Sequence, residues 1–196
     1  MTTGRNPFEA IFDGPANRAR EAAYQQARAV RRIAFLAGHA GDESAAFHET
    51  EMEGALRAAC ESLTDPEEVA GGLCRLAGWD AHDAFDDMPA ALCDAVTGAW
   101  PLPATIAEAW TEFQATETRT ADRQAFADAY EPPAFLEARQ RVVEEMLNGF
   151  PARGLADLLA RLSWLQHLNE RGAPRVEVQR ERLGVLRADV ERIMHP

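Results

Sequence analysis

The sequence contains no lysine, and all twenty of its basic side chains are arginines. This absence excludes a mechanism that uses a lysine Schiff base, and it excludes the lysine of a phosphate-binding P-loop. Two further catalytic signatures are missing, the His-Glu-x-x-His zinc pattern and the Gly-x-Ser-x-Gly turn. We therefore predict no catalytic residues and no cofactor. The pattern favours a non-catalytic role over an enzyme, although it leaves enzymatic activity open.

Cysteine is scarce as well, with only Cys60, Cys74 and Cys93 in the chain. The three are widely spaced and have no histidine grouped with them, a pattern that favours reduced, buried thiols over disulfides or zinc ligands. No apolar run approaches the ~20 residues that a membrane span requires, and residues 1–12 lack the apolar core of a secretory signal. We expect a cytoplasmic protein with no membrane partner.

β-Branched residues are sparse and never form alternating runs, whereas alanine, the best helix former, dominates the apolar residues. The pattern predicts an all-α fold: an irregular bundle of about seven to nine helices, with a long first helix and a coiled-coil-like last helix. Residues 1–14 are expected to form a loose arm, and residues 15–196 a single all-helical domain. Its alternative points of subdivision are the breaks at Pro101–Pro103 and Pro132–Pro133.

Start and stop signals along the chain set approximate bounds for each helix. A turn at residues 116–120 (TETRT) is expected to separate two short helices. The most leucine-rich helix is predicted to be the main core element, through Leu155, Leu158, Leu159, Leu162, Leu165 and Leu168. The expected helices cover residues 15–37, 42–62, 66–78, 89–100, 104–116, a short stretch ending at 130, 133–148, 155–171 and 174–194.

Charge is sorted along the sequence. Residues 37–131 hold twenty acidic residues against four arginines, a net charge of −16. Residues 1–36 hold three acids against six arginines (+3), and residues 132–196 hold nine against ten (+1), so the three segments sum to the total of −12. Such a distribution bears on partners and association rather than on fold.

The densest acidic group comprises Asp80, Asp83, Asp86, Asp87 and Asp94, with His82 among them. Clustered carboxylates are the ligands that Mg²⁺ prefers, as in an all-helical nucleotide hydrolase. Such a hydrolase would need Glu-x-x-Glu on one helix and Glu-x-x-Asp on another, and neither occurs in this sequence. We interpret the group as an acidic surface and predict no metal site.

The first helix places Arg20, Tyr24, Arg28, Arg31 and Arg32 on one face at helical spacing. Arginine binds phosphates and stacks on bases, and an interleaved tyrosine is typical of single-strand contact. The competing interpretation is a solvated face, or a face neutralised by the acidic segment of the same or a neighbouring chain. No recognisable nucleic-acid module accompanies it.

The last helix carries Leu183, Leu186, Val190 and Ile193, which step by three and four residues. This spacing is typical of a short seam that packs against another helix, and it predicts a protein partner or self-association.

Together these features favour a non-catalytic interaction protein: an adaptor, an accessory subunit or a chaperone of a larger assembly. Three alternatives stay open. They are a nucleic-acid-contacting subunit of a ribonucleoprotein or phage complex, an acidic mimic of nucleic acid that inhibits a nucleic-acid-binding protein, and a Mg²⁺-dependent nucleotide hydrolase.

Overall fold

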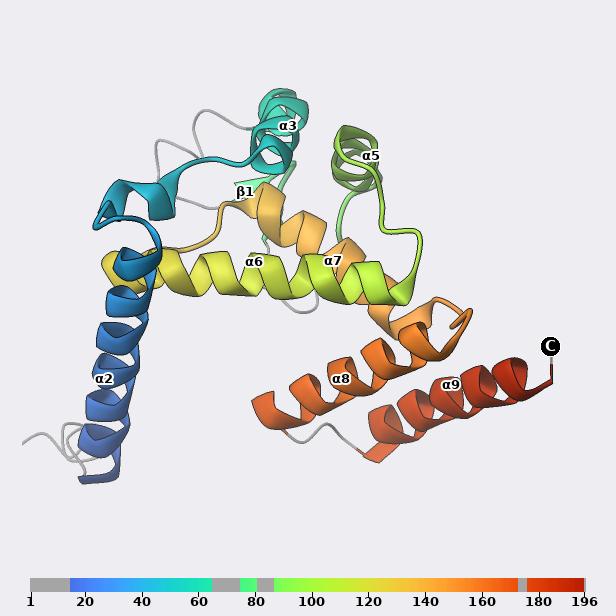
Figure 1. The fold of residues 1–196 in the computed structure, drawn as a ribbon. Helices are drawn as coiled ribbons and strands as arrows, with labels where there is room; N and C mark the ends of the chain where they lie inside the picture. The colour runs from blue at the N-terminus through green and yellow to red at the C-terminus, as the bar shows by residue number, and fades with distance from the viewer. Residues whose placement is uncertain (1–14, 65–74, 81–86, 173–175, 196) are drawn as a thin grey trace, which may run out of the picture. The chain divides into compact units, whose positions relative to one another are not determined.

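The computed structural model describes residues 15–64, 75–80, 87–172 and 176–195 (Figure 1). Within these segments the fold is all-α, as predicted, with seven α-helices, two 3-10 helices and one pair of very short strands. The elements are α2 (Pro15–Gly38), η1 (Glu43–Phe47), α3 (Glu51–Cys60), η2 (Glu61–Leu63), β1 (Arg75–Leu76), β2 (Trp79–Asp80), α5 (Ala90–Ala99), α6 (Ile106–Phe126), α7 (Ala134–Gly149), α8 (Leu155–Arg171) and α9 (Val176–Met194).

The expected arm at residues 1–14 and most of the expected helix at 66–78 lie outside the described residues. None of the helices that are described has the length and apolar character needed to cross a membrane.

Three local predictions are corrected by the structure. The expected helix at 42–62 is divided, because Asp42 caps only the short η1 and α3 begins at a capping box. In that box the Thr50 hydroxyl accepts from the Glu53 amide at 3.1 Å, and the Glu53 carboxylate accepts from the Thr50 amide at 2.9 Å. Two orphan amides at the helix start are thereby satisfied, which fixes the start of α3.

The second correction concerns residues 75–78, which were expected to end a helix. They begin a hairpin in which Leu76 pairs with Trp79 across a two-residue turn. Ala77 and Gly78 both have positive φ, 53° and 79°, as a tight turn between two strands requires. Leu76 and Trp79 are both buried, so the hairpin is fixed by packing rather than by strand propensity.

The third correction concerns residues 116–120, where no turn occurs and α6 runs unbroken to Phe126. The segment contains threonine and charged residues but neither glycine nor proline. Threonine disfavours a helix only weakly, and the buried residues Phe113 and Ala125 anchor α6 on both sides of the segment. Packing therefore overrides the local preference.

The chain divides into two compact units. The first comprises Met1–His48 and Arg119–Glu131, and the second comprises Glu49–Thr118 and Pro132–Pro196.

In the first unit, α2 is held against the last turns of α6. Phe35 meets Phe126 edge to face, with ring centroids 5.4 Å apart. The Arg123 side chain is buried and donates to the Ala46 carbonyl at 3.0 Å and to the Tyr130 hydroxyl at 2.9 Å. One arginine thus joins η1, α6 and the segment after α6.

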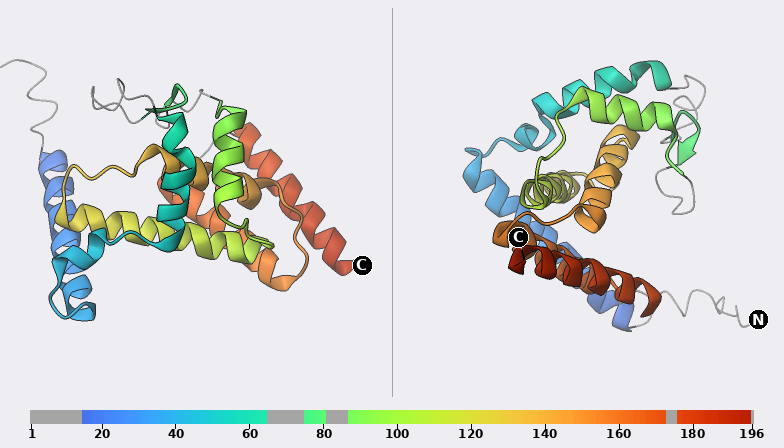
Figure 2. Two further views of the ribbon diagram at one scale, coloured as in Figure 1. Left: turned by 90° about the horizontal axis from the view of Figure 1, so that it is seen from above. Right: turned by 90° about the vertical axis from the view of Figure 1, so that its right-hand side faces the viewer.

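In the second unit, α7 contributes to both hydrophobic clusters and is central (Figures 1 and 2). One cluster joins α7 to α3, α5 and the hairpin, around Leu56, Trp79 and Leu92. The other joins α7 to α6 and α8, around Phe113 and Trp164. Helices α8 and α9 form an antiparallel pair beyond this second cluster (Figure 2).

The leucine-rich helix α8 buries its predicted core leucines only in part. Leu168 packs against the cluster around Phe113 and Trp164, and Leu158 and Leu165 are half-buried. Its buried residues are Asp157, Ala160, Arg161 and Trp164, which share one helical face. Leu155, Leu159 and Leu162 lie on the opposite face and are 66%, 55% and 44% exposed. The leucine spacing predicted the position of the helix correctly. The face that packs inward is the one whose polar side chains, Asp157 and Arg161, form hydrogen bonds with other segments.

Candidate functional site

Three arginines of α2 form ion pairs with carboxylates of the acidic segment. Arg28 pairs with Asp128 and donates its Nε–H to the Gln124 carbonyl at 3.0 Å. Arg31 lies 2.7 Å from Asp122, and Arg32 lies 3.0 Å from Glu43. Arginines of the basic N-terminal segment therefore pair with carboxylates of the acidic segment inside the first unit.

The remaining members of this predicted face are Arg20 and Tyr24, and both are exposed. The Tyr24 ring is 46% exposed, and the Arg28 guanidinium lies 5.7 Å from its centroid. A nucleic acid that bound this face would have to displace ion pairs formed by Arg28, Arg31 and Arg32.

The predicted acidic group is spread over several elements. Asp80 ends β2 and lies 3.5 Å from Arg75, Asp87 precedes α5, and Asp94 is exposed on α5. Asp83, Asp86 and His82 lie outside the described residues. Where side chains are described, no group of three or more His, Cys, Asp or Glu is placed to hold a metal ion.

The predicted seam of α9 is divided between the inside and the outside of the second unit. Ile193 packs against the cluster around Phe113 and Trp164, and Leu186 is half-buried. Leu183 and Val190 point outward and are 61% and 36% exposed. Met194, which sequence analysis did not single out, is 69% exposed and continues the outward stripe.

One hollow on the surface is shared by α8 and α9. Leu165 of α8 and Leu183 of α9 line a common hollow, together with Asn169, Gln179 and Arg182. Since the helices are antiparallel, later residues of α9 lie beside earlier residues of α8. We call the resulting surface the apolar hairpin face, which consists of Leu155, Leu159, Leu162, Leu183, Val190 and Met194.

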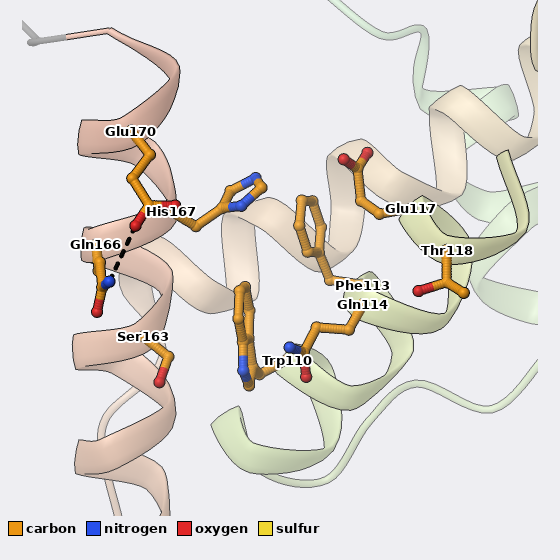
Figure 3. Close-up of a pocket in the computed structure, with 9 residues that line it drawn as sticks. All are labelled: Trp110, Phe113, Gln114, Glu117, Thr118, Ser163, Gln166, His167 and Glu170. Carbon is orange, nitrogen blue, oxygen red and sulfur yellow. Dashed lines mark hydrogen bonds between the residues drawn. The ribbon is translucent and has the colours of Figure 1, made fainter. Parts of the chain in front are cut away.

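A second surface feature is a cleft of about 410 Å³ between α6 and α8 (Figure 3). Its aromatic wall contains Trp110 and Phe113, whose rings stack with centroids 5.6 Å apart. The His167 ring meets both edge to face, at 5.9 and 5.1 Å. The nine lining residues are Trp110, Phe113, Gln114, Glu117, Thr118, Ser163, Gln166, His167 and Glu170.

Two carboxylates, those of Glu117 and Glu170, line the edge of this cleft. Glu117 pairs with Arg171 and also accepts from the Gln140 amide at 3.3 Å. Glu170 accepts from the Gln166 amide at 2.9 Å. The His167 Nε2 atom is buried without a hydrogen-bond partner. The cleft was not predicted from the sequence, although the spacing of Trp110, Phe113 and Glu117 places these three residues on one face of α6.

A buried ionic cluster links α8, α9 and the loop that follows α7. Arg161 donates to the carbonyls of Asn148 and Phe150 and lies 3.7 Å from Asp189. Burial lowers the pKa of Arg161, and the nearby carboxylates of Asp189 and Asp157 oppose that shift. This cluster positions the apolar hairpin face.

In comparisons with known proteins, no family, no curated protein and no solved structure matches this chain.

Proposed function

We propose that this chain is a non-catalytic helical interaction protein that binds a partner through the apolar hairpin face. The observation that carries the proposal is the exposure of its six large apolar side chains, which ranges from 36% to 69%. Exposed apolar residues are ordinary when scattered, but a contiguous group on two adjacent helices is typical of an interface.

The partner that we propose first is a second copy of this chain, because the face lies in the segment with the least net charge. Each copy carries a net charge of −12, and residues 37–131 alone carry −16, so two acidic segments repel each other. Residues 132–196, which contain the apolar hairpin face, carry only +1. Two copies that meet through this face bring their least repulsive surfaces together.

The flanks of the face also suit self-association. The exposed ion pair between Arg187 and Glu191 places both signs of charge on α9. A two-fold interface applies the same patch to itself, so a patch of mixed sign can oppose each charge with its opposite. A partner with a strongly charged surface would gain less from this arrangement.

Sedimentation equilibrium over a concentration series tests the proposal. We expect the wild type to dimerise, and Leu159→Glu or Leu183→Glu to be monomeric because each places a charge in the apolar contact. Leu102→Glu is the matched control, since Leu102 is 42% exposed but lies outside α8 and α9. Circular dichroism verifies that each variant keeps its helices.

A wild type that stays monomeric up to about 100 μM would contradict self-association, because stable dimers of ordinary interface size form well below this concentration. Dimers that survive both face variants would place the interface elsewhere and would equally contradict the proposal.

The alternatives predict different behaviour. Nucleic-acid contact through α2 predicts binding that weakens with salt and is lost in Arg28→Glu with Arg31→Glu. An acidic mimic predicts a nucleic-acid-binding partner that DNA displaces. A nucleotide hydrolase predicts a thermal shift that requires Mg²⁺ and disappears in Asp83→Asn with Asp87→Asn.

A further inference from the structure

The cleft between α6 and α8 combines aromatic surface with negative charge. Trp110, Phe113 and His167 form its apolar wall, and Glu117 and Glu170 supply two carboxylates (Figure 3). None of its nine lining residues is an arginine. The electron-rich faces of aromatic rings attract cations, and carboxylates at the rim add to that attraction.

The cleft already shows how one guanidinium is held at its edge. Arg171, which follows Glu170 at the end of α8, pairs with the Glu117 carboxylate. The Arg171 side chain is 56% exposed, so this ion pair is weakly stabilising and open to exchange. An incoming guanidinium could make the same bond to Glu117 while it gains the aromatic wall.

The dimensions limit the ligand to a small group. A volume of about 410 Å³ lies near the lower end of the range for ligand sites, about 300–1,000 Å³. Such a space accommodates one arginine side chain or a molecule of similar size. The amides of Gln114 and Gln166 provide additional polar contacts for a planar cation.

We propose that this cleft binds a guanidinium cation, which packs on the aromatic wall and donates to the carboxylates of Glu117 or Glu170. The cation has two sources that share this chemistry, an arginine side chain of a partner segment or a free guanidino compound. The cleft adjoins the apolar hairpin face on α8, since Ser163 and Gln166 follow Leu159 and Leu162 by four residues each. The proposal does not require self-association.

The test uses the full chain and three probes. The probes are agmatine, a short peptide with one arginine, and the same peptide with citrulline, which keeps the shape of arginine but is uncharged. The readout is the indole N–H resonance of Trp110, assigned by its loss in Trp110→Phe. We expect the arginine peptide to shift this resonance saturably and the citrulline peptide to leave it unchanged.

Agmatine distinguishes the sources. Saturation by agmatine at a lower concentration than the peptide assigns the site to a free guanidino compound, and the reverse order assigns it to a partner segment. Glu117→Gln and Glu170→Gln should each weaken binding about two- to fivefold, the effect of one exposed ion pair. Glu181→Gln, an exposed carboxylate on α9 outside the cleft, is the matched control and should leave affinity unchanged.

Two results would overturn the proposal. One is the absence of any saturable shift up to about 10 mM of either cationic probe, since this range covers even millimolar dissociation constants. The other is an equal response to the arginine and citrulline peptides, which would show that the site does not recognise the positive charge. A thermal melt of each variant separates a loss of binding from a loss of folding.

Discussion

Asp189 is a buried carboxylate at the junction of α8, α9 and the loop between α7 and α8. Its side chain is only 2% exposed. One oxygen accepts from the Ala152 amide at 3.0 Å and from Arg192 at 2.8 Å, while the other lies 3.7 Å from Arg161. We predict that Asp189→Asn lowers the free energy of unfolding by about 3 kcal/mol, because removing one charge of a buried ion pair costs about 3–5 kcal/mol.

For Asp189→Asn we expect a loss at the lower end of the range of about 3–5 kcal/mol. Asparagine has nearly the same volume, and its amide oxygen can still accept from the Ala152 amide. Arg161 keeps its bonds to the Asn148 and Phe150 carbonyls but loses its nearest negative charge. Burial lowers the pKa of Arg161, and the Asp189 and Asp157 carboxylates oppose that shift, so they offset part of the cost of burying the guanidinium.

Urea unfolding followed by circular dichroism measures the change. Glu191→Gln is the matched control, because it removes a carboxylate from the same helix at an exposed ion pair with Arg187. The control should lose less than about 0.5 kcal/mol. Equal losses in Asp189→Asn and Glu191→Gln would refute the reasoning.

Two further predictions concern Glu144 and the hairpin turn. Burial raises the pKa of Glu144, and the Glu117 carboxylate acts in the same direction. The folded protein therefore loses stability as the pH rises from the ordinary glutamate pKa through the higher pKa of Glu144 in the folded state. Glu144→Gln should melt above the wild type at pH 7 and lose that advantage below about pH 4; a lower melting temperature at pH 7 would contradict this. Ala77 has a φ of 53° beside Gly78, so Ala77→Asn should raise the free energy of unfolding by about 0.5 kcal/mol and Gly78→Val should lower it by about 1–2 kcal/mol. Urea midpoints in the opposite order would argue against a turn held by left-handed residues.

The fold class and most helix positions follow from the sequence because they depend on local patterns. The helix at α8 illustrates the limit of those patterns. Leucine spacing identifies a helix, but Leu155, Leu159 and Leu162 face outward while Asp157 and Arg161 face inward. The inward face depends on acceptors and donors from distant segments, such as the Ala107 amide that bonds to Asp157 at 3.0 Å. Such long-range partners leave no periodic signal.

For the candidate surfaces too, features of a single helix follow from the sequence and features shared by two helices do not. Leu183 and Val190 were identified from spacing along α9, since a stripe is a property of one helix. The cleft was not identified, because its wall joins Trp110 and Phe113 of α6 to His167 of α8, more than fifty residues later in the chain. A site shared by two helices requires their packing to be known.

Several buried arginines each form hydrogen bonds to more than one backbone carbonyl, which gives the arginine-only composition a structural role. Arg139 donates to the Trp100 carbonyl at 3.1 Å and the Pro101 carbonyl at 2.8 Å, and its Nε lies 2.7 Å from Glu112. Arg123 likewise bonds the Ala46 carbonyl in η1, and Arg161 bonds the Asn148 carbonyl in the last turn of α7. The planar fork of five donors allows one side chain to make several such bonds, which a single ammonium group could not reproduce in the same geometry.

This placement also bears on function. Arginines that bond carbonyls inside each unit, or carboxylates in the first unit, are committed to holding the fold. Arg28 is of this kind, because it donates to the Gln124 carbonyl and pairs with Asp128, while Arg31 and Arg32 form more exposed ion pairs with Asp122 and Glu43. A ligand that used them would have to replace existing ion pairs, whereas a partner of the apolar hairpin face displaces only water. We therefore expect association through α8 and α9 rather than through the basic first helix.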